Sequence, residues 1–203
     1  ARYEYIDYDF KVNGRRDDEV SRRDHLLTPD LSLGYSFNEE SQISLSYKMA
    51  IVKPPYSQLT GSLSYVGRHE IEGGNPLLRD ERMHDIQLFG LWKGFMLQAD
   101  YTRSLDTYAF VKQLYPADNL QLLMHPVNIN VSALNLYLVW SQPIRRWTPN
   151  LTTGIYRQWL TLDSTRHDKP IISYYFDNTF ALPRGWQITA NISGRSQGDM
   201  HTN

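Results

Sequence analysis

Apolar and polar residues alternate with a period of two along much of the chain. The clearest stretches are 29–37, 42–50, 95–103 and 186–193. Successive side chains of a β-strand point to opposite faces of the sheet, so each stretch predicts a strand with one apolar and one polar face. In the third stretch the apolar face holds Phe95, Leu97, Ala99 and Tyr101, and the polar face holds Met96, Gln98, Asp100 and Thr102.

Further strands are expected where the alternation is less regular, and no stretch shows a clear helical period. They lie near 2–10, 83–92, 129–141, 149–162 and 172–182. The pattern therefore predicts an all-β chain of about nine strands. We expect strands that follow one another to pair antiparallel throughout, as an up-and-down meander.

This arrangement also predicts which side chains share a face. Ile43, Leu45 and Tyr47 should lie on the same face as Leu97, Ala99 and Tyr101. The opposite, polar face is expected to hold Ser44, Ser46, Lys48, Gln98 and Asp100.

Long and short connections between the strands alternate along the chain. Long polar segments are expected at 11–28, 51–82 and 104–128, while 38–41, 93–94 and 183–185 are short and 142–148 is intermediate. In a meander, alternate connections lie on the same rim of the sheet. Bacterial outer-membrane barrels have this asymmetry, with short periplasmic turns and long extracellular loops.

Tryptophans accompany the short connections. Trp92, Trp140, Trp147 and Trp186 all fall beside them. Outer-membrane barrels carry aromatic girdles at both membrane interfaces, so these residues predict one girdle at the rim of short turns. A soluble antiparallel sheet with one wet face also alternates, and it is the competing interpretation.

Composition narrows the function classes. The chain has 203 residues, a formal net charge of −1 and no cysteine. The charge gives no indication of nucleic-acid binding, and disulfides, thiolate zinc sites and cysteine nucleophiles are excluded. The sequence opens at Ala1 in a strand-like segment without a signal peptide, so we expect residues 1–203 to be one partial barrel domain of a longer protein.

Side chains that could carry chemistry do not form a convincing site in the sequence. Asp17-Asp18-Glu19 could bind a cation, but the arginines around it favour a solvated loop of mixed charge. His69 and Glu70 would face opposite ways on a strand, which argues against zinc ligation with Glu72. No nucleophile elbow and no phosphate-binding glycine loop is present. We therefore predict no catalytic, cofactor-binding or metal-binding residue.

The strongest chain breaker is Gly73-Gly74-Asn75-Pro76, which precedes the strand expected from Met83. Pro76 cannot donate a hydrogen bond to a neighbouring strand and moves Asn75 away from helical backbone angles. Glycines permit tight backbone geometry. We expect this segment to place the chain for its re-entry into the sheet.

The ordered set of motifs resembles the barrel of TonB-dependent outer-membrane receptors, and most closely the outer-membrane β-barrel family common in Bacteroidota. The resemblance covers about residues 1–110. It rests on "RYE", "PDLSLGY", "SLSY" followed by "PPY", "GNPLLRDE" at 74–81 and "MHDIQLFG" at 83–90. Two departures are Lys53-Pro54-Pro55, where the family commonly has Arg-Pro, and Asp80, where it has proline.

The resemblance implies a role in transport rather than catalysis. Such barrels have about 22 strands and a lumen filled by a plug domain. The family's external loops capture a scarce ligand, and TonB contacts the plug from the periplasm; this sequence contains neither the plug nor the TonB-binding segment. The chain would supply barrel wall in contact with outer-membrane lipid, with 11–28, 51–82 and 104–128 as capture loops.

An isolated chain would expose open sheet edges near Arg2 and Ile192, and we expect it to self-associate through them. The alternative functions are a soluble β-sheet binding module, such as one for carbohydrate, and an enzyme on a β scaffold.

Overall fold

The protein forms strands over almost its whole length. The structure is a computed structural model, and it describes residues 1–12, 14–18, 21–115, 118–162 and 165–199. These ranges hold fifteen strands. The first eight are β1 (Arg2–Tyr8), β2 (Lys11–Val12), β3 (Arg15–Arg16), β4 (Arg22–Thr28), β5 (Asp30–Asn38), β6 (Ser41–Val52), β7 (Leu63–Gly67) and β8 (Glu70–Gly73).

The second half of the chain contains the longest strands. These elements are β9 (Glu81–Trp92), β10 (Phe95–Tyr115), β11 (Asp118–Ser141), β12 (Trp147–Leu162), β13 (Thr165–His167), β14 (Ile171–Ala181) and β15 (Gln187–Arg195). The helices within the described ranges are α1 (Tyr56–Leu59) and the single 3-10 turn η1 (Pro183–Gly185). No helix in this part of the chain has the length and apolar character needed to cross a membrane. The predicted all-β fold is confirmed.

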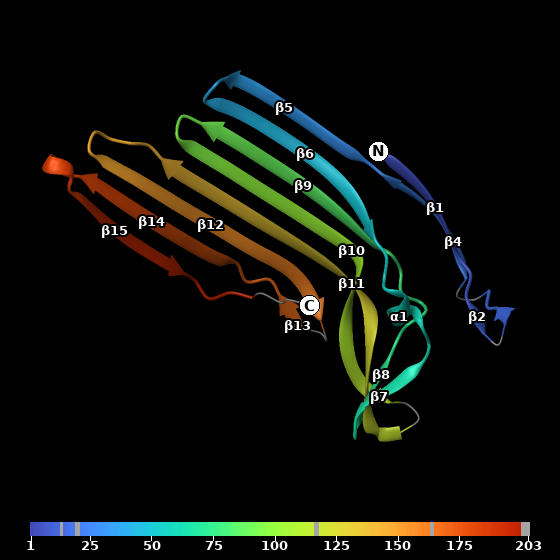
Figure 1. The fold of residues 1–203 in the computed structure, drawn as a ribbon. Coiled ribbons are helices and arrows are strands. Elements are labelled where there is room, and N and C mark those ends of the chain that lie inside the picture. Colours follow the sequence, from blue (N-terminus) through green and yellow to red (C-terminus); the bar gives the residue numbers. More distant parts are fainter. Residues whose placement is uncertain (13, 19–20, 116–117, 163–164, 200–203) are drawn as a thin grey trace.

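Eleven of the strands make one curved sheet (Figure 1). Its hydrogen-bonded order is β15-β14-β12-β11-β10-β9-β6-β5, with β13 paired to β12, β8 to β11 and β7 to β8. Strands β1 and β4 form a separate two-stranded sheet that continues the line of β5. The strand that begins at Arg2 therefore has an edge outside the main sheet, because among the described residues β1 pairs only with β4, and the path of the main sheet ends at β5 and β15.

All nine expected strands are present, but six more lie in segments expected to be loops. Segment 11–28 contains β2, β3 and β4, and segment 51–82 contains α1, β7 and β8. Segment 104–128 is almost entirely strand, because β10 and β11, which are 21 and 24 residues long, extend through it. The regular alternation is interrupted there by a break in register between Ser104 and Thr107, and beyond it buried residues such as Ala109 stand next to exposed ones such as Phe110.

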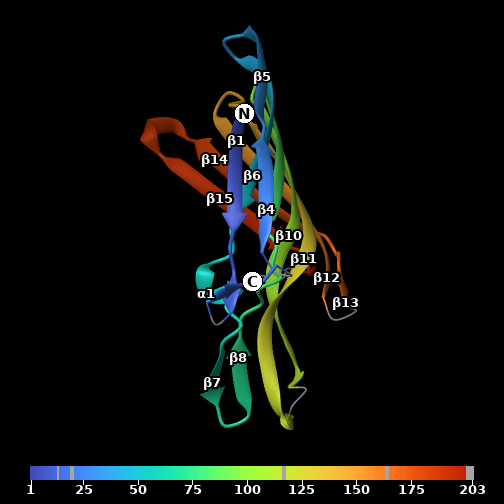
Figure 2. The ribbon, with the colours of Figure 1, turned by 90° about the vertical axis from the view of Figure 1, so that its right-hand side faces the viewer.

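The pairing is antiparallel with one exception. Strand β8 runs parallel to β11, with Leu122 opposite Glu70 and Met124 opposite Glu72. The expectation of antiparallel neighbours throughout is wrong at this point. The pairing of β11 with β12 ends at Ser132 and Trp159, which leaves the far edge of β11 free to take β8. Figure 2 shows the β7–β8 hairpin lying beside the extended β10–β11 hairpin.

The two rims of the sheet differ as predicted. One rim carries the turns that join β5 to β6, β9 to β10, β11 to β12 and β14 to β15. The turn Lys93–Gly94 has both φ angles positive, at 41° and 84°, which is the geometry of a tight two-residue hairpin. Gly94 also lies where an added Cβ would come within 2.8 Å of the Ser141 carbonyl oxygen. The other rim carries the β1–β4, β7–β8 and β10–β11 hairpins.

The register gives the sheet an apolar face and a polar face. Leu45 lies opposite Leu88, Leu88 opposite Ala99, and Ala99 opposite Leu136. The rows on either side of this one join Ile43 to Leu97 through Gly90, and Tyr47 to Tyr101 through Ile86. Directly paired residues point to the same side of a sheet, so the predicted grouping of apolar side chains is confirmed.

None of the residues that the structure describes packs over the apolar face. Leu33 is 73%, Leu45 47% and Ile188 53% exposed. The apolar side chains that are buried in the described part of the chain all lie near the rim of long hairpins: Leu59, Ile71, Leu78, Ala109, Leu160 and Ile171. An apolar surface of this extent is covered by another apolar phase in a stable protein.

An aromatic belt borders the apolar face at the rim of short turns. The ring centroids of Phe37 and Trp92 are 5.8 Å apart, and those of Phe95 and Trp140 are 6.3 Å apart. Trp147 continues the belt, 6.5 Å from Trp140 and 6.2 Å from Phe180. Its indole Nε1 donates a hydrogen bond of 2.9 Å to Asn178 Oδ1. Rings with one apolar and one polar end suit a membrane–water interface, as the sequence predicted.

Spin labels on the two faces should respond oppositely to oxygen and to a water-soluble relaxant. In the full-length protein in lipid vesicles, labels at Leu45 and Ala99 should be accessible to oxygen, which concentrates in lipid. Labels at Gln98 and Asp100, on the opposite face, should be shielded from it. Single-cysteine labelling is straightforward because this chain has no cysteine. The reverse pattern would show that the faces are assigned the wrong way round.

Candidate functional site

The polar face of the sheet is lined by paired hydrogen-bonding groups. Thr102 Oγ1 donates to Asp85 Oδ1 at 2.7 Å, and Gln98 Nε2 donates to Asp100 Oδ2 at 2.8 Å. The other oxygen of Asp100 is buried and accepts no hydrogen bond from the described residues. Ser44, Ser46 and Lys48 stand on the same face, as predicted, in rows with Phe89, Gln87 and Asp85. This polar wall offers acceptors for water or a polar partner.

The segment around Asn75 joins two hairpins that are far apart in sequence. Asn75 Nδ2 donates to the carbonyl oxygen of Pro126 at 3.0 Å, while its Oδ1 accepts from the Leu77 amide at 3.0 Å. The backbone amide of Asn75 donates to the Gln58 carbonyl at 2.6 Å. One side chain thus closes its own turn and ties that turn to β11. The Gly-Asn-Pro motif does more than return the chain to the sheet.

Gly74 is required by close backbone approach. A Cβ atom at this residue would lie 2.2 Å from the Thr60 carbonyl oxygen and 2.8 Å from that of Gln58. Real Cβ atoms do not approach backbone oxygens so closely, and no flexible side chain is available to move aside. The α1 segment can therefore pack against the Asn75 turn only when residue 74 lacks a side chain.

A small apolar core holds this junction together. Leu59 of α1, Ile71 of β8 and Leu78 are 3%, 2% and 0% exposed, and Pro126 of β11 is also fully buried. Alongside it, Lys112 Nζ and Glu70 Oε1 form an ion pair of 2.6 Å between β10 and β8. We call the set Leu59, Ile71, Asn75, Leu78 and Pro126 the junction core.

A second set of polar contacts fixes the chain between the junction core and β9. Asn128 Oδ1 accepts from the Arg79 amide at 3.0 Å, and Asn128 Nδ2 donates to the Asp106 carbonyl at 2.6 Å. Asp106 has a positive φ of 60° at an irregularity in β10, and its carboxylate pairs with Arg82 at 3.0 Å. No pattern in the sequence reveals this network, because its members come from three separate segments.

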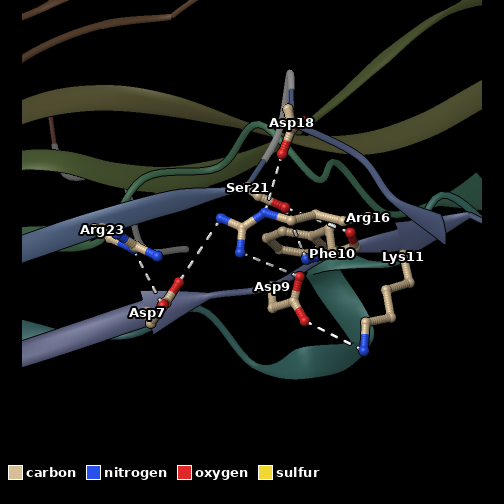
Figure 3. Close-up of polar contacts among 8 residues, drawn as sticks. All are labelled: Asp7, Asp9, Phe10, Lys11, Arg16, Asp18, Ser21 and Arg23. Carbon is tan, nitrogen blue, oxygen red and sulfur yellow. Dashed lines mark hydrogen bonds and ion pairs between the residues drawn. The ribbon is translucent and has the colours of Figure 1, made fainter.

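The tip of the β1–β4 hairpin carries a cluster of charges centred on Arg16 (Figure 3). Its guanidinium lies 3.6 Å from Asp9 and 3.0 Å from Asp18. Asp7 is shared between Arg16 at 4.0 Å and Arg23 at 3.3 Å. Of the possible cation site at Asp17-Asp18-Glu19, Asp18 pairs with Arg16, and Glu19 lies outside the described residues.

The hairpin is also tied to the junction, and a cleft lies between them. Tyr8 donates to Asp80 Oδ1 at 2.6 Å. The cleft has a volume of about 590 Å³ and is lined mainly by charged and polar side chains of β4 and of 76–82. Those side chains include Arg23, Asp24, His25, Arg79, Asp80 and Arg82. Its lining fits a polar or charged ligand rather than an apolar one.

The histidines serve the packing of strands where the structure describes their contacts. Tyr3 and Tyr47 hydroxyls lie 2.6 Å and 2.9 Å from the Nδ1 atoms of His25 and His84. His69 is at the β7–β8 turn, where its carbonyl accepts from the Leu122 amide, and Glu70 beside it is engaged by Lys112. No group of three potential metal ligands occurs in the described part of the chain.

Substitution of Gly74 by alanine should loosen the junction core, whereas the same change at Gly61 should not. Overpacking of this kind costs about 1–3 kcal/mol, which corresponds to about a five- to 150-fold loss of protection from hydrogen exchange. A Cβ at Gly61 meets nothing within 4 Å. The measurement is exchange of the Asn75 and Leu78 amides in the full-length protein. Equal exchange in the two variants would contradict the steric argument.

The comparisons with known proteins agree with this architecture. A family model described as "Outer membrane protein beta-barrel family" matches residues 1–202. No curated protein and no solved structure matches the chain. The match favours a membrane barrel over the soluble binding module, and it accounts for the uncovered apolar face as the surface that meets lipid. The chain belongs to the outer membrane protein beta-barrel family and resides in the bacterial outer membrane.

Proposed function

We propose that this chain forms part of the barrel wall and of the extracellular loops of a TonB-dependent transporter. The complete protein would add a plug domain within the barrel, contact TonB from the periplasm and import a scarce ligand. The chain itself has a structural and ligand-binding role in this proposal and no catalytic one. One of the motifs that resemble TonB-dependent receptors, at 74–81, supplies Asn75 and Leu78 to the junction core.

The observation that carries the proposal is the junction core. Asn75 and the residues around it hold the β7–β8 and β10–β11 hairpins in a fixed relation at the rim opposite the short turns. Binding residues commonly lie on loops that a rigid scaffold positions, and the junction core supplies such a scaffold. The charged cleft of about 590 Å³ beside the junction is a suitable place for the first contact with a polar ligand.

The polar wall supports the presence of a partner in the lumen. The buried oxygen of Asp100 and the buried Oδ1 of Asn150 both accept no hydrogen bond from the described residues. Buried acceptors in folded proteins are normally satisfied by protein or ordered water. A plug domain with donor side chains, or a layer of water between plug and wall, would satisfy them.

The experiment is cross-linking of the full-length protein to the periplasmic domain of TonB, in cells with and without proton-motive force. We expect a specific cross-link, and we expect uptake of any ligand that co-purifies with the protein to stop when TonB is deleted. Uptake that continues without TonB, together with steady ion conductance in a planar bilayer, would instead identify a passive pore.

The isolated chain should not persist as a monomer in water. The outer edges of β5 and β15 are unpaired within the described residues, and the apolar face is uncovered. Unpaired strand edges pair with other strands, and exposed apolar sheets associate. Light scattering should show oligomers without detergent and smaller particles with it. A stable, detergent-free monomer would contradict this expectation.

A further inference from the structure

The lipid-facing surface changes from apolar to basic close to the rim of long hairpins. Four rows across the sheet, from Trp92–Phe95 to Ile86–Tyr101, are apolar or uncharged on strands β9 and β10. The next row of the same face holds His84 and Arg103, and its continuation on β12 is Trp159. Arg157 stands one row nearer the membrane centre on β12.

The spacing places these arginines at the outer membrane interface. Eight residues separate Trp92 from His84 along β9, which is about 26 Å at 3.3 Å per residue. Strands in such barrels tilt by about 40°, so the distance along the membrane normal is about 20 Å, close to the height of the apolar band. The rim of short turns is periplasmic in these barrels, so the row of His84 and Arg103 meets the headgroups of the outer leaflet. Arg157, one row below, lies over the ring of Trp159, which belongs to that row.

The charges of the arginines are only partly neutralised by carboxylates of the described residues. Arg157 lies over the Trp159 ring, 5.0 Å from its centroid, and its Nε donates to the Asp168 carbonyl at 3.0 Å. Arg166 pairs with Asp168 at 2.8 Å. Arg103 is exposed and forms no ion pair with any described residue. Arg157 and Arg166 thus share one carboxylate, since Asp168 Oδ2 lies 3.6 Å and 2.8 Å from their Nη2 atoms, and Arg103 adds a third guanidinium group to this part of the face.

A notch adjoins the arginines where β11 and β12 separate. It has a volume of about 580 Å³, and its lining includes Asn130, Trp159, Thr161 and Arg166, together with Asn128, whose amide group is already bonded to Arg79 and Asp106. Guanidinium groups bind phosphate through two parallel hydrogen bonds, and amide and hydroxyl side chains bind sugar hydroxyls. The notch is therefore both polar and basic on a surface that otherwise meets acyl chains.

We propose that Arg103, Arg157 and Arg166, with Trp159 and the notch, form a binding site for the phosphorylated sugar headgroup of an outer-leaflet glycolipid. The arginines bind the phosphate, the notch takes the adjoining sugar, and the acyl chains lie along the apolar face below. The site depends on membership of the outer-membrane family and does not depend on transport or on TonB.

The test is titration of the detergent-solubilised full-length protein with a rough-type lipopolysaccharide. The double variant R103Q/R157Q should bind at least about tenfold more weakly, since one lost charge-assisted contact accounts for a factor of ten or more. The matched control is K93Q/R184Q, which removes two exposed cations from the opposite rim. The control should bind within about twofold of the unmodified protein.

Two further arms separate the possible sources of binding. Dephosphorylated glycolipid should bind as weakly as the lipopolysaccharide binds to R103Q/R157Q, and inorganic phosphate or phosphatidylglycerol should compete poorly. R103K/R157K keeps the charge without the paired donors, so it should bind with intermediate affinity if both variants retain the heat-resistant folded band on gels. Equal loss in the control, or equal binding of phosphatidylglycerol or of the dephosphorylated lipid, would overturn the proposal.

Discussion

Backbone hydrogen bonding between neighbouring strands is the constraint on which the rest of this structure depends. A segment surrounded by hydrocarbon has no water to satisfy its amide and carbonyl groups, so every strand must pair with the next. The unbroken order from β15 to β5 meets this requirement across the apolar band. Once pairing is continuous, the register decides everything else, because a slip of one residue would turn every side chain to the other face. The apolar rows, the polar wall and the aromatic belt all follow from that register.

Local pattern was enough to find the strands that cross this band, and it failed beyond it. Residues 95–103 alternate because one side meets an apolar phase and the other a polar one. The continuation of the same strand to Tyr115 begins with a break in register between Ser104 and Thr107, where Asp106 has a positive φ, so the regular period is interrupted there. The parallel pairing of β8 with β11 has no signal in either segment, since it depends on which edge the rest of the sheet leaves free.

In the candidate site, too, local backbone features are predictable from the sequence and contacts between distant segments are not. Gly74 and Asn75 were identified as a chain breaker from residue type alone, and their backbone role was predicted. Their partners were not, because Pro126 lies 51 residues away and offers only a carbonyl oxygen, which every residue has. The charged residues at 15–18 are a different case. Their sequence alone is compatible with a cation site, whereas the folded hairpin shows the Arg16 guanidinium beside the carboxylates of Asp9 and Asp18.

The Asn75–Pro126 contact has a consequence for the order in which the protein assembles. Contacts between segments distant in sequence form late, because the loop that joins them must first be closed. Here that loop contains β9, β10 and much of β11, which are joined by a two-residue turn and by adjacent pairing. Those strands can pair in succession, starting from their turns, while they enter the membrane. Their pairing brings Pro126 to the rim of long hairpins. The contact between Asn75 and Pro126 would then form last, after the strands of the barrel wall have paired.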